Sequence, residues 1–268
     1  MAVRMIVVIY TLRSDPEKTL VKAQTPSGEA SAAPELGPLR APTFVDHVVE
    51  AIVSRAVLGQ FRPGARINEL ALAKELGVSR APIREALRML VALGVVENTP
   101  YQGMRLAPLT PERVRQINEV RLELEKLSVR EISAEKGRAE LAKDLQDVLE
   151  DMKTAARKEN RLALAMLDAD FHETIMRASG NPVLLKLWQM LRPQLVIIFG
   201  LAETKKALRK IVDEHRVLLN GLETLSFDKV TVLMEQHIME DNLAIDFLSL
   251  EAAGSKEEER KPRRTAAK

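Results

Sequence analysis

The stretch from Leu70 to Leu90 constrains the fold of this chain more than any other part of the sequence. It reads LALAKELGVSRAPIREALRML: a short amphipathic helix, a turn at Gly77-Val78, and a second helix that begins at Ser79. The Ser79 hydroxyl can accept a hydrogen bond from the free amides of the first helical turn. Two short helices joined by such a turn form a helix-turn-helix, and the stretch predicts this motif.

The second of these helices has two distinct faces. Apolar side chains recur on one face at steps of three or four residues and are expected to pack in a core: Ile83, Leu87 and Leu90. Arginines follow one another at intervals of about one turn on another face: Arg80, Arg84 and Arg88. Guanidinium groups on a protruding helix suit phosphates and guanine edges in the major groove of DNA. By itself this pattern fits DNA binding and a merely solvated charged face equally well.

Two short strands are expected directly after this helix. They cover Val95 to Asn98 and Met104 to Ala107, and the turn-rich loop Thr99-Pro-Tyr-Gln-Gly103 joins them. This pattern predicts a β-hairpin. A hairpin that follows a recognition helix is a wing, so the unit is expected to be a winged helix-turn-helix.

At this point the chain resembles the GntR superfamily of bacterial transcription regulators. The resemblance covers residues 43–108 and is carried by Phe61-Arg-Pro-Gly64, Leu70 to Leu76, Gly77 to Leu87, Leu93-Gly-Val-Val96 and Gly103. It implies binding to double-stranded operator DNA through Ser79, Arg80, Arg84, Arg88 and Gly103. Ser79 would lie against a phosphate, and Gly103 would lie at the wing tip, where a side chain would obstruct the groove. Operator half-sites one helical turn apart favour a homodimer.

The boundaries of the DNA-binding unit, residues 43–108, follow from helix caps and turns. The first helix is expected from about Phe44 to Leu58 with Thr43 as its cap, and Asn68 is expected to cap the second helix. Thr110 supplies a capping hydroxyl, and proline and glutamate follow it in the first helical turn. These features predict a short linker and a new helix from Pro111.

From Pro111 onward the sequence predicts helices only. We expect them at 111–136 (ended by Gly137), 139–158, 160–178, 183–202 (bent near Pro193), 205–224 and 227–250. The expected fold is therefore mostly α, with the winged helix-turn-helix followed by an all-α helical bundle over residues 109–251.

The two ends of the chain are expected to be disordered. Residues 1–42 are rich in Pro, Ser, Ala and charge, and residues 252–268 form a charged tail. The apolar run Met5 to Leu12 is too short to span a bilayer, and a secretory signal is a weak alternative because no small-residue cleavage site follows it. We expect no membrane segment. The absence of Cys fits a reducing cytoplasm.

The candidate metal-binding residues of the expected bundle are its histidines. The chain has only four, and His172, His215 and His237 fall in three different expected helices. Asp168 precedes His172 by one helical turn, so both side chains share a face and could hold one cation. A single histidine on an apolar face is better explained as a hydrogen-bonded core residue. Three histidines with an aspartate favour a divalent metal; zinc is preferred, and nickel, iron or manganese would also fit.

These spacings are also similar to the FCD branch of the GntR family. They include Asp168-Ala-Asp-Phe-His172, Ser179-Gly-Asn181 and Glu214-His215. In that branch a helical effector domain carries one Asp and three His around a divalent metal. The resemblance implies Asp168, His172, His215 and His237 as the ligands. Asp170, on a different helical face, is the second choice of carboxylate.

Arg121 matches the arginine of the first bundle helix in that branch. Near a metal, its guanidinium would suit the carboxylate of a small effector. The alternative is an ion pair with Glu125, four residues further along the helix.

Three classes of function are consistent with these residues. The preferred class is a cytoplasmic, ligand-responsive transcription regulator whose metal-containing pocket senses a small organic acid. A metal-dependent hydrolytic enzyme is the rival, because an Asp/His centre with open positions can activate water. However, the sequence has no HExxH, nucleophile elbow or glycine-rich phosphate loop, so we expect a non-enzyme. A regulator with a purely structural metal and no effector is the third class.

Overall fold

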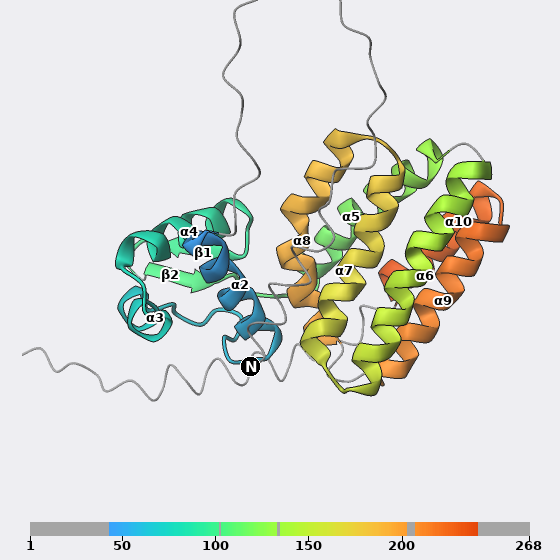
Figure 1. Cartoon of the computed structure of the whole chain (residues 1–268). Helices are drawn as coiled ribbons and strands as arrows, with labels where there is room; N and C mark the ends of the chain where they lie inside the picture. Colours follow the sequence, from blue (N-terminus) through green and yellow to red (C-terminus); the bar gives the residue numbers. More distant parts are fainter. Residues whose placement is uncertain (1–42, 102, 133–134, 203–206, 241–268) are drawn as a thin grey trace, which may run out of the picture. The chain divides into compact units, whose positions relative to one another are not determined.

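The computed structural model describes residues 43–101, 103–132, 135–202 and 207–240 (Figure 1). The expected arm, residues 1–42, and the expected charged tail, residues 252–268, lie outside the described residues.

The described part of the chain begins with a winged helix-turn-helix. Its elements are α2 (Phe44–Val57), α3 (Glu69–Leu76), α4 (Arg80–Ala92), β1 (Val96–Thr99) and β2 (Gly103–Leu106). The two strands pair antiparallel, with Val96 opposite Leu106 and Thr99 opposite Gly103. The predicted hairpin is confirmed, with both strands displaced by one residue from the expected ranges. Arg66 adds an antiparallel bridge to Arg105 of β2.

The helix caps of this unit form largely as the sequence predicts. The Thr43 hydroxyl accepts from the Asp46 amide and completes a capping box, and the Asn68 side chain accepts from the amides of Leu70 and Ala71. Ser79 does occupy the N-cap position of α4, but the predicted capping hydrogen bond from its side chain is wrong. The exposed Ser79 hydroxyl is therefore not committed to the helix.

One apolar core holds the winged helix together. The predicted inward residues of α4 are all fully buried, and they meet buried side chains of α2 and of both strands: Val48, Ile52, Ile83, Leu87, Leu90, Val96 and Leu106. Because removing apolar area from water is the main favourable term in folding, this shared core fixes α4 against α2. The opposite face of α4 is left to solvent.

The rest of the described chain is helical. Its elements are α5 (Pro111–Glu131), α6 (Glu135–Arg157), α7 (Arg161–Ala178), α8 (Pro182–Ala202), α9 (Leu208–Thr224), α10 (Phe227–Glu235) and the π-helical turn η1 (Gln236–Glu240). Helices α7 and α9 both pack along α6, and α8 packs along α7 (Figure 1). The expectation of a mostly α fold with an all-α bundle is confirmed.

The predicted boundary between the first two helices of the bundle is wrong. Helix α5 ends at Glu131, because the chain leaves helical geometry at the buried Ile132. Gly137 does not end it but lies inside α6, close to the Ile132 side chain. The last α-helix ends at Glu235 and gives way to the π-helical turn, and the predicted continuation to residue 250 lies outside the described residues.

Helix α8 is the most apolar helix of the described bundle. Among the described helices it alone has the length and mean hydropathy of a membrane-spanning segment. Half of its most apolar stretch is nevertheless buried inside the protein, as in the core helix of a folded domain. It contains Pro193 and the buried side chains of Trp188 and Phe199, and it packs against α2 as well as α7.

Candidate metal centre and DNA-binding surface

Four potential metal ligands from three elements of the bundle converge at one point. Asp168 and His172 lie one turn apart on α7, His215 lies on α9, and His237 lies on the π-helical turn. Oδ1 of Asp168 is 3.3 Å from Nε2 of His215 and 3.6 Å from Nε2 of His172. Nε2 of His237 is 3.3 Å from Nε2 of His172. The structure thus brings together all four residues that the sequence nominated.

The imidazoles of His172 and His215 are oriented by hydrogen bonds at their other nitrogen. Nδ1 of His215 lies 2.8 Å from the main-chain oxygen of Ile211, and Nδ1 of His172 lies 2.8 Å from Oε2 of Glu125. Because a carbonyl or carboxylate oxygen accepts, each Nδ1 carries the proton of the neutral ring. The lone pair of each ring is then on Nε2, which is the orientation that metal-binding histidines commonly adopt.

The donor set fits a divalent cation. Within the described residues, Oδ1 of Asp168 and Nε2 of His215 are both buried without a hydrogen-bond partner, although they lie 3.3 Å apart. Two acceptors at that distance repel each other unless a proton or a cation lies between them. Ligands at zinc distances are separated by about 3.4 Å along the edge of a tetrahedron, close to the spacings found here.

The charges of the metal-free centre follow from burial and from these contacts. Burial disfavours a charged imidazole, yet the Asp168 carboxylate raises the pKa of His215 above its ordinary value. Burial also disfavours a charged carboxyl, but His215, His172 and Arg121 hold the pKa of Asp168 well below its usual range. In the absence of metal, a proton on His215 can therefore occupy the position between the two groups.

Arg121 lies directly beside the candidate ligands. Its Nε donates to Oε1 of Glu125 at 2.7 Å, and its Nη2 donates to Nε2 of His172 at 2.7 Å. The alternative ion pair with Glu125 is thus present, and the same guanidinium also reaches the centre. Burial, followed by the effect of Arg121, holds the pKa of His172 well below its ordinary value, and burial raises the pKa of Glu125.

Asp170 does not join the candidate ligands. Its Oδ1 lies 2.5 Å from Nη2 of Arg192 on α8, and Nε of Arg192 lies 3.1 Å from Oε2 of Glu173. The second choice of carboxylate is therefore wrong in this structure, because a helical step of two residues turns Asp170 away from His172 and toward α8.

Aromatic rings of α8 enclose the arginine side of the centre. The Arg121 guanidinium lies 4.8 Å from the ring centre of Phe199 and 6.0 Å from that of Trp188. In the part of the chain that the structure describes, Nε1 of Trp188 is buried without a hydrogen-bond partner, as is Oδ1 of Asn118, one turn before Arg121 on α5. Buried polar atoms of this kind are normally satisfied by a partner in the working molecule.

The candidate DNA-binding residues lie on the outer face of the winged helix. Ser79, Arg80, Arg84 and Arg88 are all exposed. Arg80 and Arg84 both donate to the same carboxylate oxygen of Glu69, at the start of α3. Two of the three arginines on this face are therefore linked through one carboxylate.

Gly103 is the first residue of β2, just beyond the tip of the wing. Its φ of +79° is a left-handed conformation that glycine adopts without strain. A Cβ atom at this position would meet only the Arg66 side chain, at 3.9 Å. The tip itself carries Tyr101, a fully exposed aromatic residue with φ of +64°. Such an outlier at an exposed loop is a candidate for contact with a partner.

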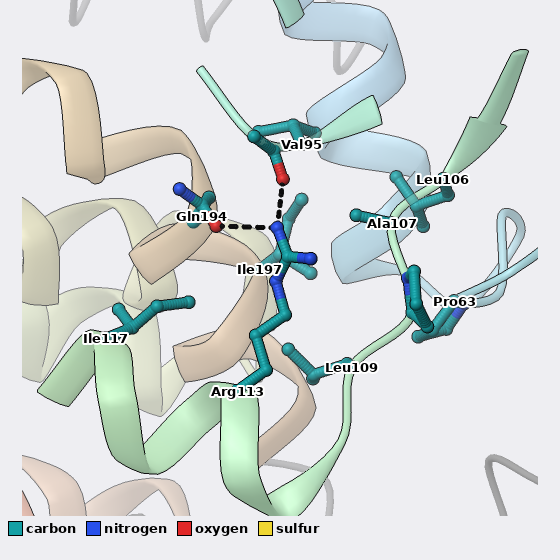
Figure 2. Close-up of a pocket in the computed structure, with 11 residues that line it drawn as sticks. Pro63, Val95, Leu106, Ala107, Leu109, Arg113, Ile117, Gln194 and Ile197 are labelled. Carbon is teal, nitrogen blue, oxygen red and sulfur yellow. Dashed lines mark hydrogen bonds between the residues drawn. The ribbon is translucent and has the colours of Figure 1, made fainter. Parts of the chain in front are cut away.

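A polar contact joins the bundle to the end of the recognition helix. Nη2 of Arg113 on α5 donates to the main-chain oxygen of Gly94 at 2.6 Å and to Oε1 of Gln194 on α8 at 3.2 Å. Nε2 of Gln194 donates to the main-chain oxygen of Leu93 at 2.9 Å. Figure 2 shows the side chains of Arg113 and Gln194 beside a small cavity of about 20 Å³.

Family comparisons agree with this architecture. The profile described as "Bacterial regulatory proteins, gntR family" matches residues 44–106, and the FCD domain profile matches residues 116–240. The chain belongs to the GntR family. Within that family it is a transcriptional regulator with a helix-turn-helix domain and an FCD domain.

Several members of the family are similar along most of their length. The gluconate operon transcriptional repressor of Bacillus subtilis is 30% identical over 189 residues, which cover 68% of this chain and 76% of the repressor. A probable D-xylose utilization operon transcriptional repressor of Paenarthrobacter nicotinovorans is 29% identical over 181 residues, which cover 68% of this chain and 79% of that protein. Among solved structures, McbR/YncC of E. coli superposes with a TM-score of 0.62 at 20% identity, over 79% of this chain and 99% of the other. This last likeness supports the fold.

Sequence reasoning missed several of the connecting residues. Glu125 appeared only as an ion-pair partner, although its position one turn after Arg121 put it on the same face of α5. Glu69 and Gln194 gave no recognisable signal, because the partners of each lie outside its own helix.

Proposed function

We propose that this regulator of the GntR family controls transcription in response to a small carboxylate that binds beside a divalent metal in the bundle. In this proposal residues 43–108 bind operator DNA and residues 109–251 form the effector and metal-binding domain. One observation carries it: Oδ1 of Asp168 and Nε2 of His215, both buried and without a hydrogen-bond partner among the described residues, lie 3.3 Å apart within a set of four donors.

The metal would be held by one aspartate oxygen and three imidazole nitrogens, from Asp168, His172, His215 and His237. This mixture of N and O donors suits zinc first, and nickel, iron or manganese also fit it. When bound, such an ion supplies a Lewis-acidic position that can hold a carboxylate oxygen. Glu125 and the Ile211 main-chain oxygen orient two of the imidazoles for this purpose.

Arg121 would hold the effector carboxylate. In the metal-free centre its Nη2 donates to the lone pair of His172 Nε2, which is the same lone pair that a metal would take. Metal binding would therefore leave this N–H group without its acceptor, while Nε stays with Glu125. A carboxylate beside the ion could then accept from Arg121 in a strong, charge-assisted hydrogen bond.

The DNA-binding surface would comprise the exposed Ser79, Arg80, Arg84 and Arg88, with the wing at Gly103. A homodimer would place two recognition helices in half-sites about one helical turn apart. Effector binding would alter the placement of these helices through α5 and α8. These two helices contribute Arg121, Trp188 and Phe199 beside the centre. They also contribute Arg113 and Gln194 beside α4.

The experiment begins with metal analysis of the full-length protein, purified without a polyhistidine tag. We expect about one divalent ion per chain, a lower melting temperature after chelation, and recovery when zinc is added. Gluconate serves as the first carboxylate probe, because a similar protein is a gluconate operon repressor. His215→Ala should abolish the response to zinc, while His47→Ala, at an exposed position on α2, should preserve it.

The rival functions give different results in the same assays. A structural metal without an effector would raise the melting temperature, but no carboxylate would then change operator affinity. A hydrolytic enzyme would turn over ester or amide substrates in a manner that depends on His215. A protein without metal, whose melting is indifferent to chelator and to His215→Ala, would contradict the metal-dependent part of the proposal.

A further inference from the structure

Glu69 lies at the junction of the two helices of the helix-turn-helix. It is the first residue of α3, directly after the Asn68 cap, and its side chain reaches α4. Oε2 of Glu69 accepts from Nε of Arg84 at 2.9 Å and from Nη2 of Arg80 at 3.3 Å. One carboxylate oxygen therefore holds both arginines at the start of the recognition helix.

These ion pairs are too exposed to contribute much to the stability of the fold. The side chains of Arg80 and Arg84 are 55% and 53% exposed, and that of Glu69 is 27% exposed. Ion pairs in water contribute little net free energy, because solvation and side-chain entropy oppose them. Their consequence here is geometric: they limit the directions in which two long, otherwise mobile side chains can point.

The two arginines use different nitrogens in these contacts. Arg84 donates through Nε, which leaves both of its Nη groups at the end of the side chain. Those two Nη groups have no hydrogen-bond partner within the described residues. Arg80 donates through Nη2, so one of its two terminal Nη groups is already engaged in a hydrogen bond. An end-on pair of Nη groups matches the O6 and N7 acceptors of guanine, whereas a single N–H group is sufficient for a phosphate oxygen.

We propose that Glu69 is a positioning residue for sequence recognition, holding Arg84 with its terminal Nη pair directed at a guanine edge and leaving Arg80 to a phosphate. The inference rests on the proposed DNA-binding surface and adds to it a separate role for each arginine, base contact for Arg84 and phosphate contact for Arg80. It also makes an acidic residue, which by itself repels phosphates, necessary for specific binding.

The rival explanation is that Glu69 only lowers the positive charge of the surface. The two explanations predict opposite changes in affinity for the preferred DNA sequence when Glu69 is removed. Removal of a simple counter-charge would strengthen binding to every duplex alike. Removal of a positioning residue would weaken binding to the preferred sequence, while binding to other sequences stays unchanged or becomes stronger.

The test uses the full-length protein and two DNA probes. The specific probe is a duplex of about 20 base pairs, selected by the wild-type protein from a randomised library, and the non-specific probe is poly(dA·dT), which has no guanine edge. Glu69→Ala should lower affinity for the selected duplex on the order of tenfold without lowering affinity for poly(dA·dT). Repeating the selection with Glu69→Ala should show a broader base preference at one guanine of each half-site. Glu69→Gln retains an acceptor for Arg84 Nε and should restore part of the preference.

Glu75→Ala is the matched control. Glu75 lies on the same helix and also forms an ion pair with an arginine, but that partner is Arg55 on α2. Melting temperatures of all variants check that each one is folded. Equal gains in affinity for both probes, or the same effect from Glu75→Ala, would overturn the assignment of Glu69. A folded wild-type protein that selects no duplex would instead overturn the DNA-binding surface together with it.

Discussion

Gln194 donates a hydrogen bond from its Nε2 to the main-chain oxygen of Leu93, the residue that ends the recognition helix α4. Its Oε1 accepts from Arg113, which in turn donates to the main-chain oxygen of Gly94. Because main-chain atoms receive these bonds, a shift of α5 or α8 would act on the position of α4 itself. We expect this contact to carry the effector response.

Gln194→Ala should uncouple effector binding from DNA binding. The substitution removes both hydrogen bonds but no ligand of the candidate centre, so zinc should still raise the melting temperature. The change in operator affinity on addition of the effector should fall severalfold. Fluorescence anisotropy with a labelled operator, with and without gluconate as the first probe, measures this change. Gln189→Ala, on an exposed position of the same helix, is the control. An undiminished effector response in Gln194→Ala would contradict the coupling role.

His172 and His215 should change the stability of the metal-free protein in opposite directions on the two sides of about pH 6.5, the ordinary pKa of histidine. Because the folded-state pKa of His215 is raised, its contribution is present below about pH 6.5 and is lost as the pH rises through the raised value. The folded-state pKa of His172 is lowered, so its contribution is present above about pH 6.5 and is lost as the pH falls. Urea unfolding with chelator between about pH 5.5 and 8 measures the free energy of unfolding on both sides of this pH.

His215→Ala separates the contribution of His215 to the pH dependence of stability from that of His172. The loss of stability that His215 causes above about pH 6.5 should disappear, and the loss that His172 causes at lower pH should remain. In the unsubstituted protein, saturating zinc should likewise remove the loss of stability that His215 causes at higher pH, because the ion replaces the proton of His215. A metal-free profile that is flat across this range would mean that the histidines are not perturbed in the manner described.

Arg84→Ala should weaken specific DNA binding by about 1 to 3 kcal/mol without lowering the melting temperature, because Arg84 makes no core contact. Affinity of the unsubstituted protein should also fall steeply with salt, since phosphate contacts release counterions. Arg209→Ala, which removes an exposed arginine from α9, should change neither quantity. Operator affinity that is the same in Arg84→Ala and the parent protein would remove Arg84 from the interface.

Gly103→Ala should destabilise the wing by about 1 kcal/mol, because alanine is strained at φ of +79°. The free energy of unfolding, measured without DNA, reports this strain. The matched control is Gly137→Ala, inside α6, where φ is not positive and the nearest neighbour of a new Cβ lies at 3.6 Å. Alanine there should be neutral or stabilising, since it favours a helix more than glycine does. If both variants have equal stability, the backbone conformation is not what requires glycine at position 103.

The fold could be predicted in detail wherever local signals decide it. The Thr43, Asn68 and Thr110 caps and the arginine and leucine faces of α4 are all local patterns. Prediction failed at Gly137, since a glycine can also be accommodated inside a helix, and at Ser79, where a suitable capping residue forms no cap.

The candidate metal centre was predictable only as a set of residue types at particular positions. Helical spacing joined Asp168 to His172, but the approach of His215 and His237 depends on how α9 and the π-helical turn pack against α7. Likewise, the preference for Asp168 over Asp170 followed from helical geometry, whereas the partner of Asp170 on α8 could not be inferred from spacing.

The close packing of α2 against α8 has a consequence for the evolution of these regulators. A Cβ atom added to Gly200 would lie 2.5 Å from Cγ1 of Val57, so even alanine would not fit unless the two helices moved apart. Homologues that bear a larger residue at this position must therefore carry a compensating smaller residue on α2 or hold the two helices further apart. Paired exchanges at these two sites would therefore mark homologues in which α2 and α8 pack at a different distance from each other.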